Sequence, residues 1–170
     1  PRQVFATDPL GQGWTHNYNS YIINTDEVLD DYGNPLATPC LLVYWADGTI
    51  HVYDNENAPE HPKAITKGVY NVVTKVNGSQ YTVKMKDQTV CTFTKISGAA
   101  DDSPYMLTRM EDRHGNGTTL TYGIGENGIP RISTVSDDAG RDLVFTYHPN
   151  TNYLWKVTDP LSRSVSFVVE

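Results

Sequence analysis

The chain has 170 residues, a net charge of −7 at pH 7, and 38% hydrophobic against 19% charged residues. This composition can bury the core of one ordinary domain, so we do not expect wholesale disorder. Its lysines and arginines are scattered singly, and no apolar run approaches the roughly 20 residues of a membrane-spanning helix. We therefore expect no nucleic-acid partner and no membrane span.

Two-residue alternation dominates the chain, and helical periodicity is almost missing. In the first half, Asp47-Gly48 follows the apolar run from Leu41 to Trp45, and Asn77-Gly78 follows the run from Val69 to Val76. Such dipeptides between apolar runs indicate β-hairpins, and the pattern continues across Lys86 to Gln88 into a further strand. The sequence predicts an all-β fold, an antiparallel meander of hairpins that forms a curved or spiralling sheet with few or no helices.

The sequence changes character after the polar stretch GAADDSP. We expect an N-terminal meander over residues 1–98, a linker loop over 99–106 and a repeat region over 107–170. Three sixteen-residue segments of that last region align without a gap: Leu107 to Tyr122 (LTRMEDRHGNGTTLTY), Ile132 to Tyr147 (ISTVSDDAGRDLVFTY) and Leu154 to Val169 (LWKVTDPLSRSVSFVV). Because one hairpin alone is marginal in water, stacked hairpins are expected to bury a continuous sheet face.

Each segment has aspartate at its sixth position and Gly, Gly or Ser at its ninth. Asp-x-x-Gly has the preferences of a type I turn, in which the first side chain accepts hydrogen bonds from backbone N–H groups ahead of it. We interpret the recurring aspartates as turn-capping residues and not as catalytic ones. The predicted turn residues are Asp112, Gly115, Asp137, Gly140, Arg141, Asp159, Pro160 and Arg163.

The strand before each turn alternates less regularly than the strand after it. Its apolar residues, at the first and fourth positions, fall on opposite faces of an ideal strand. A β-bulge or burial on both faces would resolve the conflict, and both alternatives stay open at this point. After each turn the bulky residues share one face, as Leu143, Phe145 and Tyr147 do.

These segments resemble a known family. Asp137 to Arg141 (DDAGR) followed by Phe145-Thr146-Tyr147 is similar to the RHS repeat, also called the YD repeat, in which a hydrophobic strand, an Asp-x-x-Gly-Arg turn and a strand ending in Phe-x-Tyr follow one another. Asp112 to Asn116 (DRHGN) and Asp159 to Arg163 (DPLSR) look like variants of that turn. Leu10 to Tyr18 (LGQGWTHNY) resembles the G-x-G-W-x-x-x-Y opening that precedes the repeats in bacterial RHS proteins.

The resemblance implies a long β-sheet that spirals into a hollow shell. In bacterial RHS proteins and insecticidal toxin complexes this shell encloses a variable C-terminal toxin, and teneurins carry a related barrel outside animal cells. The chain would then be a non-catalytic structural fragment of a large secreted or cell-surface protein, bacterial rather than eukaryotic, with the rest of its polypeptide as partner. The unpaired edge after the last repeat would favour edge-to-edge self-association of the fragment.

A carbohydrate- or cell-surface-binding module is the alternative function. Trp14, Tyr18, Trp45 and Trp155 are the candidate ligand-contact aromatics, although such rings also pack between sheet layers. No CxxC, His-x-x-x-His or nucleophile-elbow pattern is present, so we expect no metal, cofactor or enzymatic activity. Cys40 and Cys91 are expected to be two buried thiols or a disulfide.

Overall fold

The computed structural model describes residues 9–10, 15–27, 39–57, 59–149 and 151–168. Within them, thirteen strands form one antiparallel sheet that does not close on itself. The helical elements of these residues are two single-turn 3-10 helices, η1 (Thr25–Glu27) and η2 (Glu126–Gly128), and neither has the length or apolarity to cross a membrane. The predicted all-β meander is confirmed.

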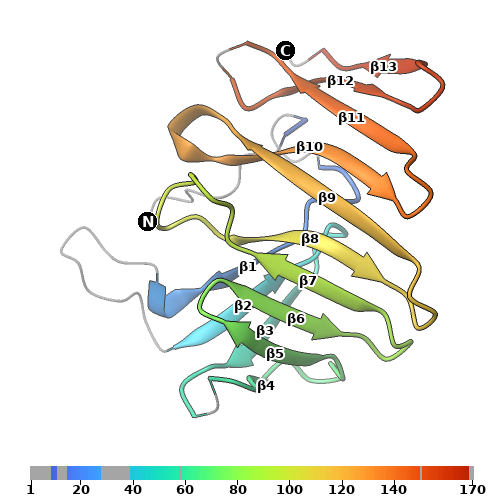
Figure 1. The fold of residues 1–170 in the computed structure, drawn as a ribbon. Helices are drawn as coiled ribbons and strands as arrows, with labels where there is room; N and C mark the ends of the chain where they lie inside the picture. Colours follow the sequence, from blue (N-terminus) through green and yellow to red (C-terminus); the bar gives the residue numbers. More distant parts are fainter. Residues whose placement is uncertain (1–8, 11–14, 28–38, 58, 150, 169–170) are drawn as a thin grey trace.

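The strands follow the chain in a succession of hairpins (Figure 1). They are β1 (Tyr21–Asn24), β2 (Cys40–Tyr44), β3 (Ile50–Asp54), β4 (Lys63–Ala64), β5 (Val72–Asn77), β6 (Gln80–Lys84), β7 (Val90–Thr94), β8 (Tyr105–Glu111), β9 (Gly117–Ile124), β10 (Pro130–Asp137), β11 (Asp142–Tyr147), β12 (Leu154–Thr158) and β13 (Ser164–Ser166). Asp47-Gly48 connects β2 to β3, and Asn77-Gly78 lies at the turn from β5 to β6, as predicted.

Five of the hairpins have the same five-residue connection. The N–H of its first residue donates to the carbonyl of the fifth, and the N–H of the fourth donates to the carbonyl of the first. The fourth residue has a positive φ, which a hairpin of this length requires. The connections span 45–49, 85–89, 112–116, 137–141 and 159–163, and their fourth residues are Gly48, Gln88, Gly115, Gly140 and Ser162.

The sheet branches at β8. This strand pairs with β7 along most of its length. On its other edge, Met106 pairs with Tyr21 of β1, whereas Arg109 pairs with Thr119 of β9. Two branches therefore leave the same edge of β8. The branch β1 to β4 pairs with the beginning of this strand, and the branch β9 to β13 pairs with its end.

The branch formed by β1 to β4 packs face to face on β5 to β7, behind which it lies in Figure 1. The indole of Trp45, just after β2, is 6.0 Å from the ring of Phe93 in β7. The side chains between the layers are 0–1% exposed: Ile22, Leu41, Val43, Tyr53, Val73, Tyr81, Val83, Cys91 and Phe93. This part of the chain is a two-layer β-sandwich.

The stretch expected to be a linker contains the beginning of a core strand. β8 starts at Tyr105, inside 99–106, and both Tyr105 and Met106 are buried. The ring of Tyr105 packs edge-on against Tyr81, at 4.9 Å between ring centroids. One core cluster includes residues from both sides of this stretch, so the change in sequence character coincides with the branch point of the sheet.

A β-bulge interrupts the first strand of each repeat. It always lies at the second residue of the sixteen-residue repeat. The pairing register shifts around Thr108 in β8, Ser133 in β10 and Trp155 in β12. Because one extra residue reverses the alternation, the first and fourth residues of each repeat reach the same face. The bulge thus resolves the alternative that the sequence left open, and Ile132 and Val135 are both buried in the core.

The N-terminal segment lies across the apolar face of the repeats. The imidazole of His16 is 5.6 Å from the ring of Phe145, and the ring of Tyr18 meets the same phenylalanine edge-on at 6.3 Å. Further along, the N–H of Leu154 donates to the carbonyl of Pro9 at 2.7 Å. Residues about 130 positions apart in the chain therefore close the core of the repeat region.

Candidate functional site

The predicted turn aspartates act on the backbone in the same way in each repeat. One carboxylate oxygen, Oδ1, accepts the N–H groups two and four residues ahead, at 2.7–3.0 Å. These bonds close the tips formed by Asp112, Asp137 and Asp159. The geometry assigns one local structural task to the three side chains.

The second carboxylate oxygen, Oδ2, binds the residue at the end of the tip. Arg141 and Arg163 each donate Nε to it, at 2.6 and 2.7 Å, and each adds an ion pair through Nη2 at 2.6 Å. In the first repeat Asn116 donates Nδ2 at 2.9 Å instead. These hydrogen bonds lower the pKa of all three aspartates. The main contribution comes in each case from the residue at the end of the tip, which is Asn116, Arg141 or Arg163. Both carboxylate oxygens of each aspartate are thus engaged within its own tip.

The glycines of the tips are required by backbone conformation and not by crowding. Gly115 and Gly140 have φ of 86° and 75°, and a Cβ at either position would meet nothing within 4 Å. The third repeat has Ser162 at φ 64°, a conformation that L residues adopt at a cost of about 1 kcal/mol. Pro160 occupies the second position of that turn, where its fixed φ suits a type I turn.

The repeat tips lie in a row along the right side of the sheet in Figure 1. Asp138, the second residue of the middle tip, accepts the backbone N–H of Gly117 and pairs with Arg109 Nη1 at 3.3 Å. Arg109 also pairs with Glu111 at 2.9 Å. The first two repeats are therefore joined through charged side chains as well as through their strands.

The three candidate ligand-contact aromatics that the structure describes do not form one site. Trp14 lies outside the described residues. Tyr18 packs on the core and lines a pocket, whereas Trp45 donates Nε1 to His51 Nδ1 at 3.0 Å and lines a different, open cleft. Trp155 is the bulge residue of β12 and is 41% exposed, with Lys156 Nζ 5.1 Å from its ring centroid.

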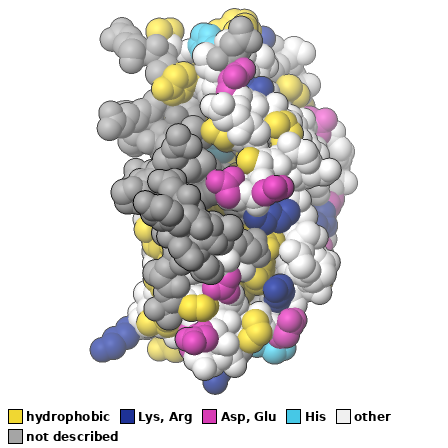
Figure 2. All heavy atoms as spheres, turned by 90° about the vertical axis from the view of Figure 1, so that its left-hand side faces the viewer, with side chains coloured by type: hydrophobic (Ala, Val, Ile, Leu, Met, Phe, Trp, Pro, Cys, Tyr) yellow, Lys and Arg dark blue, Asp and Glu magenta, His cyan; other side chains and the backbone are white. Residues whose placement is uncertain are grey.

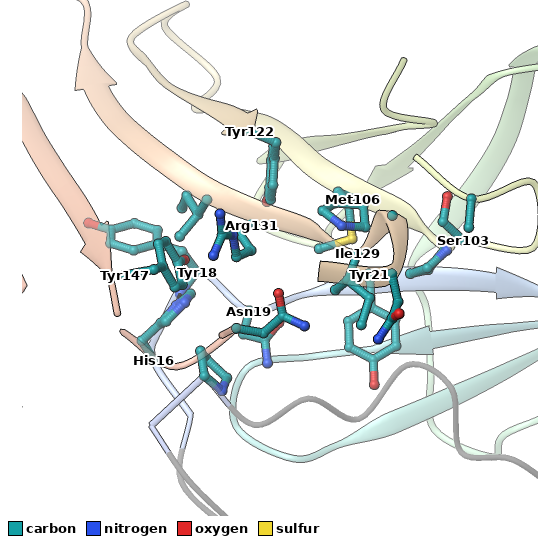
Figure 3. Close-up of a pocket in the computed structure, with 18 of the residues that line it drawn as sticks. His16, Tyr18, Asn19, Tyr21, Ser103, Met106, Tyr122, Ile129, Arg131 and Tyr147 are labelled. Atoms are coloured by element: carbon teal, nitrogen blue, oxygen red, sulfur yellow. Dashed lines mark hydrogen bonds between the residues drawn. The ribbon is translucent and has the colours of Figure 1, made fainter. Parts of the chain in front are cut away.

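The pocket that contains Tyr18 opens between the N-terminal segment and the beginning of the repeats (Figure 3). Its cavity measures about 90 Å³ and is open to solvent. Its walls come from residues 16–21, the 100–106 segment, η2 with the start of β10, and the ends of β9 and β11. It lies where the two branches of the sheet meet. Where the structure describes the neighbouring face of the molecule, acidic, basic and hydrophobic side chains are interspersed (Figure 2).

Most titratable side chains of this pocket are uncharged at neutral pH. Burial lowers the pKa of His16 to about 4, and its Nδ1 accepts the N–H of Tyr18 at 3.3 Å. Burial also raises the pKa of Tyr122 and Tyr147, and the hydroxyl of Tyr122 donates to the carbonyl of Leu107 at 2.7 Å. The charged side chains of the lining are Asp102 and Arg131, and the rest of the pocket is polar or apolar.

Arg131 is the basic side chain of the pocket lining. Its Nη1 donates to the carbonyl of Thr151 at 2.5 Å, and its Cζ lies 4.8 Å from the centroid of the Tyr147 ring. Gly125 leaves room for this side chain, because a Cβ there would lie 2.4 Å from Arg131 Nε and from Asn152 Oδ1. Two contacts therefore hold the guanidinium in place, the hydrogen bond to Thr151 and the ring of Tyr147.

Metal and redox chemistry have no visible site in the part of the chain that the structure describes. No three His, Cys, Asp or Glu side chains of these residues lie close enough together to hold a metal ion. Cys40 and Cys91 are free thiols, the first half-buried and the second buried. Burial raises the pKa of the Cys91 thiol to about 11, which keeps it protonated and unreactive at neutral pH.

Comparison with known proteins gives the chain no family: neither a family model nor a curated protein sequence matches it.

Proposed function

We propose that the chain is a non-catalytic structural fragment of a large secreted or cell-surface protein of the RHS/YD-repeat type. Its hairpins would contribute to a β-sheet shell that encloses or displays a C-terminal domain, such as a toxin. The observation that carries the proposal is recurrence. The bulge at the second residue and the aspartate-capped tip return in each of three consecutive repeats.

Two further features support a building role. The tip aspartates use both carboxylate oxygens on their own turns, which favours shape over chemistry as the reason for the repeated pattern. Among the described strands, β13 pairs with β12 alone, so its outer edge can receive a further hairpin by the same antiparallel pairing. A unit that repeats and leaves an edge for the next unit is suited to extending a sheet.

The proposal is tested by the size and location of the native polypeptide. An antibody raised against this fragment should detect a band far above the 19.0 kDa of the present chain, in the medium or on the cell surface. Protease added to intact cells should remove the surface-bound fraction. A band near 19 kDa inside the cell would contradict the proposal, because these few repeats would then act alone.

A further inference from the structure

We propose that the pocket between the N-terminal segment and the repeats binds an acidic sugar residue, a hexuronate, whose carboxylate is received by Arg131. The proposal concerns a binding site and does not rest on the building role proposed above. Of the three singled-out aromatics that the structure describes, Tyr18 is the one that lines this site.

The first argument is the missing counter-ion of Arg131. Three other arginines of the described chain pair with carboxylates at 2.6–3.3 Å: Arg109, Arg141 and Arg163. Arg131 is half-buried, yet within the described residues it has no carboxylate partner. A planar guanidinium makes strong charge-assisted hydrogen bonds to a carboxylate, so Arg131 can receive an anionic ligand, and Asp102 is the acidic side chain of the same lining.

The second argument is geometry. Thr151 takes one N–H of the guanidinium, and the ring of Tyr147 covers one of its faces. The remaining N–H groups form a planar donor edge, which matches the two oxygens of a carboxylate better than it matches a single hydroxyl. Figure 3 shows Arg131 between Tyr122 and Tyr147, on the wall of the pocket opposite Ser103.

The third argument is the rest of the lining, which suits a hydroxyl-bearing molecule. Side-chain amides can donate to and accept from hydroxyl groups, and hydrophobic residues provide contact for the C–H face of a sugar ring. The amides are those of Asn19, Asn127 and Asn152, and the hydrophobic contacts come from Pro104, Met106 and Ile129. The cavity, of about 90 Å³, is small and open to solvent, so it would receive the carboxylate end of one sugar residue.

Binding is measured on the whole chain by ¹⁵N–¹H NMR titration at pH 7 in a carboxylate-free buffer. The three probes are glucuronate, glucose and N-acetyl-aspartate, each at matched ionic strength. We expect saturable shifts with glucuronate at a Kd in the millimolar range, which is typical of one small ligand, and binding of glucose at least about 10-fold weaker. The shifted amides should include Asn19, Asn127 and Arg131.

Three variants assign the effect to the guanidinium. Arg131→Gln should weaken glucuronate binding at least about 10-fold, and Arg131→Lys should weaken it less, because it keeps the charge but loses the planar fork. Arg113→Gln, which changes an exposed arginine that contacts His114 in a repeat tip, should leave binding unchanged. The NMR spectrum of each variant shows whether it is folded.

Several results would overturn the proposal. These are shifts that do not saturate, glucose binding as tightly as glucuronate, or unchanged binding by folded Arg131→Gln. Equal binding of N-acetyl-aspartate would show that the pocket binds carboxylates without requiring a sugar, and it would also contradict the proposal of a hexuronate. If Arg131→Gln fails to fold, the proposal is still tested by comparing glucuronate with glucose on the unmodified chain and on Arg131→Lys.

Discussion

The two branches of the sheet bury their hydrophobic residues in different ways. In the sandwich, β1 to β3 and β5 to β7 cover each other, and the side chains between them are 0–1% exposed. In the repeat region, β9 to β13 form one layer, whose apolar face is covered by the segment around His16 and Tyr18. Phe145 beneath that segment is 8% exposed, and Val165, in the last strand, is 62% exposed.

This difference shows two ways of stabilising a meander. The sandwich depends on hydrophobic packing between layers, which is roughly proportional to the apolar area removed from water. The repeats have less of that burial. Each adds a bulge and a capped tip, and the second and third add an ion pair across the tip. In the repeat region, hydrogen bonds within the tips and the N-terminal segment around His16 and Tyr18 therefore take the place of a complete second sheet.

The comparison predicts unequal effects of the same substitution in the two regions. Phe93→Ala should lower the free energy of unfolding by about 4 kcal/mol, because it leaves a cavity between two sheets. Phe145→Ala should lower it by about 2 kcal/mol, because the covering segment can settle toward the gap. Urea denaturation followed by far-UV circular dichroism measures both. Equal losses would show that the repeats are as tightly packed as the sandwich.

Local signals in the sequence predicted the hairpins well. Asp47-Gly48 and the Asp-x-x-Gly tips act within five residues, so they can be recognised without the rest of the fold. The sequence narrowed the first strand of each repeat to a bulge or two-sided burial, but the choice depends on the neighbouring strand. The branch at β8 could not be predicted, since Met106 and Arg109 pair with strands that are distant from each other in sequence.

The candidate site depended even more on long-range contacts. Tyr18 was singled out for its ring, but its position beside Tyr147 follows from the path of the N-terminal segment. Arg131 carried no signal, because it lies between two repeats and belongs to no motif. Its unpaired charge becomes visible only when every described carboxylate has been placed. Trp45, also singled out for its ring, packs on Phe93 in the sandwich and lines a separate open cleft, two positions that depend on the pairing of distant strands.

The packing of the N-terminal segment on the repeats should make the free energy of unfolding depend on pH through His16. Its pKa is lowered from 6.5 to about 4 in the folded chain, so the unfolded chain binds the proton more readily. Stability is then fully present above pH 6.5 and is lost as the pH falls toward 4, by at most about 3 kcal/mol. The measurement is the urea midpoint at pH 7 and at pH 4.5.

The matched variant is His16→Asn, whose side-chain oxygen can accept the N–H of Tyr18 but cannot take up a proton in this range. Its urea midpoint should change much less between pH 7 and pH 4.5. The tip aspartates do not confuse the result, because their pKa values lie below the ordinary 3.8 and their contribution is lost only at lower pH. An equal pH dependence in the variant would rule out His16 as the cause.

The smallest effects should come from exchanging the residues with positive φ at two tips. Gly140→Ser should lower the free energy of unfolding by about 1 kcal/mol, because serine adopts that conformation less readily. Ser162→Gly should raise it by about 0.5 kcal/mol, since part of the relief is offset by the greater freedom of glycine in the unfolded chain. Thermal denaturation of the two single variants and of the double variant measures whether the effects add.

Additivity tests whether the tips of the second and third repeats are equivalent units. Each tip closes through its own aspartate and arginine, Asp137 with Arg141 and Asp159 with Arg163. Independent sites add within about 0.5 kcal/mol, so the double variant should lie close to the sum of the singles. A larger deviation would mean that neighbouring tips share their strain along the sheet. The repeats would then be one continuous structure, and not a series of equal hairpins.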